Sequence, residues 1–163
     1  MTIPIELEMR FLPPSVRRRY EKALGFSSRD KEHKVFVYGT LISGEANAHW
    51  AGNARRQKAW ALGTIHDTGC GFPAFVKRGR THVIGEVLTV NDNGLRSMDR
   101  LEGYPSLYRR EQIQVHLVGG GSVLAWVYIM NNLSKDAPVI ESGDWVAYRK
   151  TRNAERKMQD EMK

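Results

Sequence analysis

The chain has 163 residues, one cysteine and a formal net charge of +7. This length fits one domain that buries about 70% of the surface of its unfolded form, and the lone Cys70 excludes an internal disulfide. The longest apolar run, Val123 to Met130, is far shorter than the roughly 20 residues that cross a bilayer. The first residues include acids and lack the apolar core of a signal peptide. We therefore expect a cytoplasmic protein with no membrane contact.

The positive charge lies mainly at the two ends of the chain. Residues 1–34 and 148–163 each carry a net charge of +3, which leaves +1 for the middle. Basic ends suit contact with nucleic acid or acidic surfaces, although solvated helix faces explain such charge more often. The charge therefore does not favour a nucleic-acid-binding protein, and it says little about the central residues.

The N-terminal residues 1–33 are expected to form an extension with an amphipathic helix. Apolar residues fall at helical spacing after Pro13-Pro14-Ser15, the arginines between them mostly point away, and Gly25 suits the end of the helix. The apolar positions are Val16, Tyr20, Ala23 and Leu24.

From residue 34 the pattern changes to short apolar runs bounded by turns, which is typical of strands. Gly119-Gly120-Gly121 supplies the positive φ angles of a tight hairpin turn between the last two strands. Short helices are expected around Asn47 to Trp50 and over 93–102, and a polar helix over 142–162. We predict strands near 34–39, 59–66, 72–77, 82–90, 108–118 and 122–130. The fold class that follows is α+β, a small mixed β-barrel of about six strands flanked by a few helices.

The first candidate site follows the strand Val35 to Val37, which runs into Tyr38-Gly39-Thr40-Leu41. Gly39 lets the chain approach a ligand closely, and successive backbone N–H groups in such a turn can hold an anion. The alternative is an ordinary exit from a strand, in which Tyr38 packs and Gly39 turns the chain.

The second candidate is Glu102 at the end of the predicted 93–102 helix. Leu95, Met98 and Leu101 recur at helical spacing, Asp92 or Asn93 can cap the start, and Gly103 suits the end. The helix macrodipole places partial negative charge at this end and should raise the carboxyl pKa, as burial also would. A raised carboxyl pKa suits a general base. The alternative is a solvated glutamate with no function.

Four stretches in this order resemble the gamma-glutamylcyclotransferase superfamily, the AIG2-like group that includes the YtfP proteins and the gamma-glutamylamine cyclotransferases. They are the Tyr-Gly-Thr-Leu turn with Asn47-Ala48-His49-Trp50 after it, Gly85-Glu86-Val87, Asp99-Arg100-Leu101-Glu102-Gly103-Tyr104-Pro105-Ser106-Leu107-Tyr108, and Ile140-Glu141-Ser142-Gly143-Asp144-Trp145. The resemblance implies a family domain over 34–146, with residues 147–163 as a basic, helical tail.

What the resemblance implies for function is cyclisation of a gamma-glutamyl amino acid or gamma-glutamylamine to 5-oxoproline, without a cofactor. In the family, the turn holds the glutamyl head of the substrate and the glutamate is the acid and base. The matching residues are Tyr38, Gly39, Thr40 and Leu41 for substrate binding, Glu102 for catalysis, and Tyr108, which could bind substrate or orient Glu102. Tyr108 could equally be a core aromatic residue with a solvated hydroxyl.

Other polar residues leave alternatives open. Glu86 could be a second inward carboxylate or only the polar face of a strand. Asp99 could cap the helix, pair with Arg109 or be exposed, and we expect it behind the site. Asn47 and His49 could line the pocket, or cap a helix and pack.

Nucleophilic and metal chemistry have weaker support in the sequence. Cys70 lies between glycines with His66 four positions earlier, which permits but does not favour a Cys–His pair. The five histidines show no spacing typical of a metal site. We therefore predict no metal.

The rival to an enzyme is a binding module of the same fold that holds a small carboxylated ligand without turnover, with the basic ends contacting a protein or nucleic acid. Release of 5-oxoproline separates the two. The sequence leaves open whether the protein is a monomer or a homodimer, and which amine leaves the substrate.

Overall fold

The computed structural model describes residues 13, 15, 16, 19, 23 and 31–163. The chain divides into two units between Lys31 and Glu32, and the second unit contains every strand and helix described below. The amphipathic helix predicted near the N-terminus falls largely outside the described residues. The predicted domain limits at 33/34 and 146/147 stay predictions.

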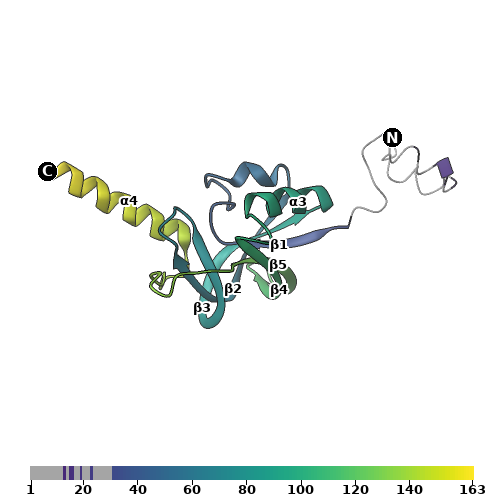
Figure 1. The fold of residues 1–163 in the computed structure, drawn as a ribbon. Helices are drawn as coiled ribbons and strands as arrows, with labels where there is room; N and C mark the ends of the chain where they lie inside the picture. Colours follow the sequence, from purple (N-terminus) through teal and green to yellow (C-terminus); the bar gives the residue numbers. More distant parts are fainter. Residues whose placement is uncertain (1–12, 14, 17–18, 20–22, 24–30) are drawn as a thin grey trace. The chain divides into compact units, whose positions relative to one another are not determined.

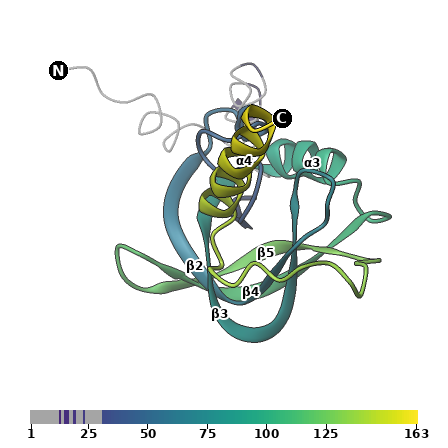
Figure 2. The same cartoon turned by 90° about the vertical axis from the view of Figure 1, so that its left-hand side faces the viewer.

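Five strands close into one barrel (Figures 1 and 2). The strands are β1 His33–Val37, β2 Arg55–Asp67, β3 Pro73–Val90, β4 Tyr108–Leu117 and β5 Ser122–Met130. Their order around the barrel is β1-β3-β2-β4-β5, and the parallel contact of β1 with β5 makes the sheet mixed. The predicted hairpin joins β4 to β5, with positive φ at Gly120 and Gly121. The α+β mixed barrel is confirmed.

One strand fewer than predicted is present because the expected strands 72–77 and 82–90 are parts of β3. The intervening Lys77 to Arg80 is exposed and polar, so it has the composition of a turn. The pairing of β3 with β2 shifts here: Thr64 faces Val76, whereas Gly63 faces Thr81. The polar residues therefore belong to an irregularity in a long strand, with Gly79 at φ 101°.

Apolar side chains gather on both faces of the barrel wall. Phe36, Val83 and Val87 point inward with the central core. Val35 and Leu88, at alternate positions, point outward and pack with Leu95 and Met98 of helix α3, Asp92–Leu101. A strand buried on both faces loses the simple alternation of apolar and polar residues. This second core fixes α3 against β1 and β3.

The start of α3 is capped by Asn91, whose side chain accepts a hydrogen bond from the N–H of Gly94 at 2.9 Å. The predicted caps, Asp92 and Asn93, are wrong by one or two positions. At the other end, Glu102 is the C-cap and Gly103 has φ 62°, as its place after the helix suggests.

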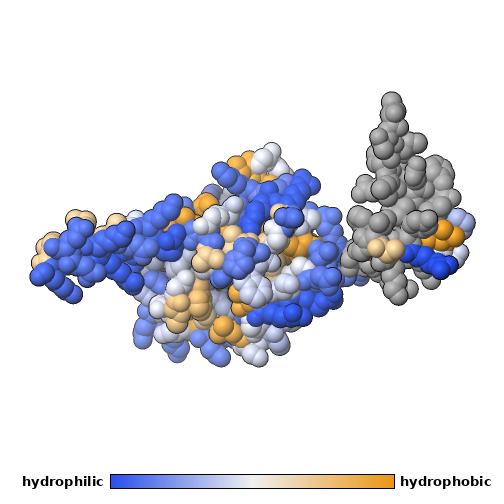
Figure 3. Space-filling view, turned by 90° about the horizontal axis from the view of Figure 1, so that it is seen from above, coloured by the Kyte–Doolittle hydropathy of each residue, from blue (hydrophilic) through white to orange (hydrophobic). Residues whose placement is uncertain are grey.

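Two further helices lie near the loop after β1 and at the C-terminus. They are the 3-10 helix η2, Ala48–Ala51, and α4, Trp145–Glu161. Trp145 is buried in the central core, and Arg149 forms two hydrogen bonds with Glu45 of the β1–η2 loop. From residue 151 onward α4 is exposed, and its visible surface is mostly hydrophilic (Figure 3). Among the described residues, no helix is both long and apolar enough to cross a membrane.

Candidate active site

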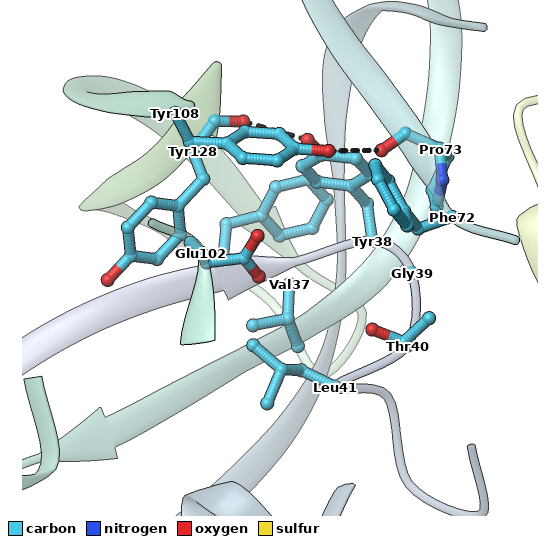
Figure 4. A pocket seen from close by; sticks show the side chains of 11 residues that line it. Val37, Tyr38, Gly39, Thr40, Leu41, Phe72, Pro73, Glu102, Tyr108 and Tyr128 are labelled. Atoms are coloured by element: carbon cyan, nitrogen blue, oxygen red, sulfur yellow. Dashed lines mark hydrogen bonds between the residues drawn. The ribbon is translucent and has the colours of Figure 1, made fainter. Parts of the chain in front are cut away.

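A pocket lies between the end of β1, the end of α3 and the start of β3 (Figure 4). It has a volume of about 340 Å³ when its open mouth is included. All six residues that the sequence suggests for the site line it, and the structure adds five others from β1, the β2–β3 loop, β3 and β5. The lining residues are Phe36, Val37, Tyr38, Gly39, Thr40, Leu41, Phe72, Pro73, Glu102, Tyr108 and Tyr128.

The turn after β1 lines this pocket and contains backbone donors without an acceptor among the described residues. The carbonyl of Gly39 accepts from the N–H of Ile42 at 3.1 Å, and the carbonyl of Thr40 accepts from the N–H of Asn47 at 2.9 Å. By contrast, the N–H groups of Gly39, Thr40 and Leu41 donate to no group in the described part of the chain. Successive free N–H groups form a site for an anion such as a carboxylate.

Packing against Pro73 also requires a glycine at position 39. A Cβ atom on Gly39 would lie 2.7 Å from Cδ of Pro73, which is closer than carbon atoms pack. Any larger residue must therefore displace Pro73, which also lines the pocket. The sequence argument for close approach to a ligand did not foresee this contact within the protein.

The loop that follows the turn is held by an ion pair between Arg56 and Glu86. The Arg56 guanidinium donates to Glu86 Oε1 at 2.9 Å and to the carbonyls of Leu41 and Ala48 at 2.9 and 3.0 Å. Glu86 also accepts from the N–H of Ser43 at 2.6 Å. Glu86 is therefore a buried carboxylate that supports the loop and does not line the pocket.

Glu102 differs from Glu86 in having no such partners. Its carboxylate points into the pocket from the side opposite Gly39 and Thr40 (Figure 4), and its side chain forms no hydrogen bond or ion pair with the described residues. Burial raises its pKa from the ordinary 4.5 to about 7. Near neutral pH the group can thus exist in both the protonated and the ionised form, which suits transfer of a proton in either direction.

Two tyrosine hydroxyls of the pocket are already bonded to backbone. Tyr38 donates to the carbonyl of Tyr128 at 2.7 Å and accepts from the N–H of Phe75 at 3.1 Å, so its hydroxyl is part of the core. Tyr108 donates to the carbonyl of Pro73 at 3.1 Å. Burial raises the pKa of both hydroxyls, so both stay protonated. Because the proton of Tyr108 points to Pro73, its oxygen remains available only as an acceptor.

A polar group behind the pocket joins α3 to the β4–β5 hairpin. Asp99 accepts two hydrogen bonds from Arg110, at 2.7 and 3.0 Å, and one from the hydroxyl of Tyr128 at 2.6 Å. Arg110 lies over the rings of Tyr104 and Trp126. The partner suggested for Asp99 was Arg109, which instead contacts Glu111.

The sequence reasoning missed Tyr128. A turn over Gly119 to Gly121, with residues 118 and 122 facing each other, would place Met130 opposite Arg110, whereas the observed register places Tyr128 there. The hydroxyl of Tyr128 thus reaches Asp99 beside Arg110. Phe72 and Pro73 gave no signal either, because Phe72 lies in the β2–β3 loop, whose path the sequence does not reveal, and Pro73 begins β3 directly after it.

A second, wider hollow adjoins the pocket and shares Thr40, Phe72, Glu102 and Tyr108 with it. Its volume is about 530 Å³ when the part open to solvent is included. Asn47, Leu101 and Leu107 complete its wall. Asn47 donates its side-chain amide to Thr40 Oγ1 at 3.0 Å, whereas His49 is exposed and lines neither hollow. Glu102 thus borders both spaces.

The structure gives no support to a Cys–His pair. Cys70 is exposed, and the Nδ1 atom of His66 lies 2.9 Å from the carbonyl oxygen of Ala137. Within the described residues, no three His, Cys, Asp or Glu side chains gather in a way that could hold a metal ion. The polar groups that the pocket does offer are backbone donors, the hydroxyl groups of Thr40 and Tyr108, and one carboxylate.

Comparison with known proteins shows what most of this chain is similar to. Residues 35–147 match the family model described as gamma-glutamyl cyclotransferase, AIG2-like. The chain is 36% identical over 120 residues to a Vibrio cholerae protein provisionally named gamma-glutamylcyclotransferase, with 70% of this chain and 96% of that protein covered.

Solved structures show the same fold. A mouse AIG2-like protein matches with a TM-score of 0.58 and 28% identity, over 69% of this chain and 88% of that one. YkqA from Bacillus subtilis matches with a TM-score of 0.63 and 23% identity, over 76% of this chain and 43% of that chain. The second likeness, below 25% identity and over less than half of YkqA, concerns the fold alone.

Proposed function

Because the chain belongs to the AIG2-like gamma-glutamyl cyclotransferase family, we propose that it converts a gamma-glutamyl amino acid or gamma-glutamylamine into 5-oxoproline and a free amine. One observation carries the proposal. The unpaired Glu102 carboxylate, with its pKa raised to about 7, lines the same pocket as the free N–H groups of Gly39, Thr40 and Leu41. An anion-binding turn and a proton acceptor are the two groups that this cyclisation needs.

The first role of the pocket is to fold the substrate. The α-carboxylate of the glutamyl group binds the N–H groups of the turn, which brings the α-amine and the side-chain carbonyl of the same molecule close together. Both reacting groups belong to one substrate, so correct orientation can lower the barrier by up to about 7–11 kcal/mol. The apolar walls, among them Val37 and Phe72, exclude water from the folded chain.

The second role is to move protons, because the attacking nitrogen carries three hydrogens as an ammonium and one in the product lactam. Glu102 accepts the first proton, and the amine nitrogen then bonds to the γ-carbonyl carbon. The bond from that carbon to the leaving nitrogen breaks as Glu102 delivers this proton to it. The attacking nitrogen gives its second proton to the Glu102 carboxylate as the lactam forms, and that proton leaves with the released amine, which becomes an ammonium. No oxidant or cofactor takes part. General acid–base catalysis of this kind contributes roughly 10²–10⁴-fold.

Negative charge develops on the γ-carbonyl oxygen during the attack, and donors must face it. Tyr38 and Tyr108 direct their protons to backbone carbonyls, so we assign this role to the turn. Tyr108 instead accepts a hydrogen bond from the α-amine, since its oxygen keeps a free lone pair.

The test is release of 5-oxoproline from a panel of gamma-glutamyl amino acids and gamma-glutamylamines, measured by chromatography of the product. Formation of 5-oxoproline and the amine in equal amounts is the expected result. Binding of the panel without release would contradict the proposal and favour the rival function, a binding module of the same fold.

A further inference from the structure

The polar group behind the pocket lies one helical turn from Glu102. Asp99 and Glu102 are three residues apart at the end of α3, so a shift of one moves the other on the same side of the helix. Glu102 lines the pocket and Asp99 does not. Asp99 can therefore affect the chemistry through the place that it gives to Glu102, a role that rests on the proposed function.

Three hydrogen bonds hold Asp99 against the β4–β5 hairpin, and the residues that form them are called here the Asp99 network. The Arg110 guanidinium donates from Nε to Oδ1 at 2.7 Å and from Nη2 to Oδ2 at 3.0 Å, and the Tyr128 hydroxyl donates to Oδ1 at 2.6 Å. The side chains of Asp99 and Arg110 are only 16% and 15% exposed. A planar guanidinium that meets both oxygens of a carboxylate fixes its orientation as well as its distance.

Arg110 holds the chain on both sides of Glu102. Its guanidinium pairs with Asp99 before Glu102, and it lies 4.4 Å from the centre of the ring of Tyr104, which follows Glu102 by two positions. On the hairpin side it lies 4.8 Å from the ring of Trp126. Cations attract the faces of aromatic rings. The position of the helix end therefore depends on the shape of the guanidinium as well as on its charge.

Tyr128 connects the network to the wall of the pocket. Its ring lies beside Glu102, and its hydroxyl points away from the pocket toward Asp99 (Figure 4). Its backbone carbonyl accepts the hydroxyl proton of Tyr38 at 2.7 Å. The same residue thus shields the Glu102 carboxylate from water and holds the helix turn that carries it.

The side chains that interact with Glu102 across the pocket carry no charge. They are tyrosines from three strands, and burial raises the pKa of each hydroxyl, so all three stay protonated: Tyr38, Tyr108 and Tyr128. The other side chains that line the two hollows are uncharged, and the ion pair behind the pocket has no net charge. Burial thus raises the pKa of Glu102 to about 7, and movement toward solvent would lower it toward the ordinary 4.5.

We propose that Asp99, Arg110 and Tyr128 are positioning residues, which hold the last turn of α3 on the hairpin so that the carboxylate of Glu102 faces the pocket. The charged groups of the Asp99 network lie behind the pocket and act through Glu102. A small displacement is enough to matter, because about 1 Å of misplacement at a reacting group can lower a rate roughly 100-fold.

The substitution Arg110→Lys tests the proposal, because lysine keeps the charge but loses the planar fork. At pH 8, where Glu102 is mostly ionised, we expect kcat for 5-oxoproline release to fall at least about tenfold. KM should change by less than about threefold, since the turn that binds the glutamyl head is untouched. Arg109→Lys is the control, because Arg109 is the neighbour on β4 and contacts the partly exposed Glu111. It should keep both constants.

A second measurement separates positioning from a simple loss of stability. The pKa of Glu102 is followed by the chemical shift of its carboxyl carbon, whose signal is identified by its absence in Glu102→Gln. We expect this pKa to fall by at least about one unit in Arg110→Lys, as the carboxylate moves toward solvent. Lower stability alone reduces the amount of folded protein and leaves the pKa within it unchanged. An unchanged kcat or an unchanged pKa would overturn the inference.

Tyr128→Phe provides the milder variant in case Arg110→Lys does not fold. It keeps the ring in the pocket and removes one of the three hydrogen bonds to Asp99. We expect kcat and the pKa of Glu102 to fall as in Arg110→Lys, but by less, and no change in either would again overturn the inference. Failure of the proposed function gives a different result. If the wild type releases no 5-oxoproline, the cyclotransferase assignment is contradicted, whereas the pKa of Glu102 in the variants, measured without substrate, still decides whether the Asp99 network positions it.

Discussion

Glu86 and Glu102 are both largely withdrawn from solvent, yet their surroundings are opposite. Glu86 accepts hydrogen bonds from Arg56 and from the backbone of Ser43, and so fixes the loop beside the pocket. Glu102 faces the pocket with no partner among the described residues, and burial raises its pKa to about 7.

The difference separates a carboxylate that stabilises the fold from one that is left free for chemistry. A paired, hydrogen-bonded carboxylate keeps its charge and supports its neighbours. An unpaired one in an apolar pocket is costly when ionised, and proteins retain such groups mainly at functional sites. Substitution of each residue should therefore have a different effect on activity and on stability.

The largest expected effect is loss of activity in Glu102→Gln. The amide keeps the shape of the side chain but cannot accept a proton, so we expect kcat to fall by roughly 10²–10⁴-fold. The measurement is 5-oxoproline release, with thermal unfolding to check that the variant is folded. Activity close to that of the wild type would remove Glu102 from the mechanism.

A large loss of stability is expected in Glu86→Gln. The substitution leaves the Arg56 guanidinium without a counter-charge at a site of low exposure, which should lower the free energy of unfolding by about 3 kcal/mol. Urea denaturation measures this change. The comparison with Glu102 would fail if Glu86→Gln were as stable as the wild type but inactive, because Glu86 would then act in the chemistry.

A gain of stability is expected in Glu102→Gln at high pH. The folded-state pKa of Glu102 lies above that of the unfolded chain, so its ionisation weakens the fold as the pH rises from 4.5 to about 7. We expect the variant to exceed the wild type by about 1–3 kcal/mol at pH 8 and by almost nothing at pH 4.5. Denaturation curves at the two pH values provide the test, and an equal difference at both would show that ionisation is not the cause.

The smallest effect is expected at Glu111, whose ion pairs are more exposed than that of Glu86. Glu111 contacts Lys77 and Arg109 at 3.3 and 3.2 Å, and both cations are about half exposed. Such pairs contribute little, so Glu111→Gln should change the free energy of unfolding by less than about 0.5 kcal/mol. A loss as large as that of Glu86→Gln would mean that burial does not determine how much an ion pair contributes to the free energy of unfolding.

Much of the fold could be predicted because its signals are local. The β4–β5 hairpin follows from three glycines between two apolar runs, and the end of α3 from Gly103 after the periodic Leu95 and Met98. The strand β3 was divided in the prediction because Lys77 to Arg80 has the composition of a turn. Only its pairing with β2 shows that the strand continues.

The candidate site could be predicted in its residues but not in its contacts. Glu102 and the turn each carry a local pattern, and the pocket brings them together. The backbone bonds of Tyr38 and the pairing of Asp99 with Arg110 depend on residues 11 to 90 positions away in the chain. Such choices among several possible partners are made by tertiary packing, which spacing along the sequence does not encode.

The three hydrogen-bonded contacts of Arg56 have a consequence for how this family can diversify. The Arg56 guanidinium donates hydrogen bonds to Leu41, Ala48 and Glu86. A side chain therefore helps to fix the loop beside the pocket, which belongs to no strand. Residues at the rim of that loop can then vary in size and polarity while the anchor holds the turn in register. Under the proposed function, new amine preferences can then arise by substitution at the rim, without any change at Glu102.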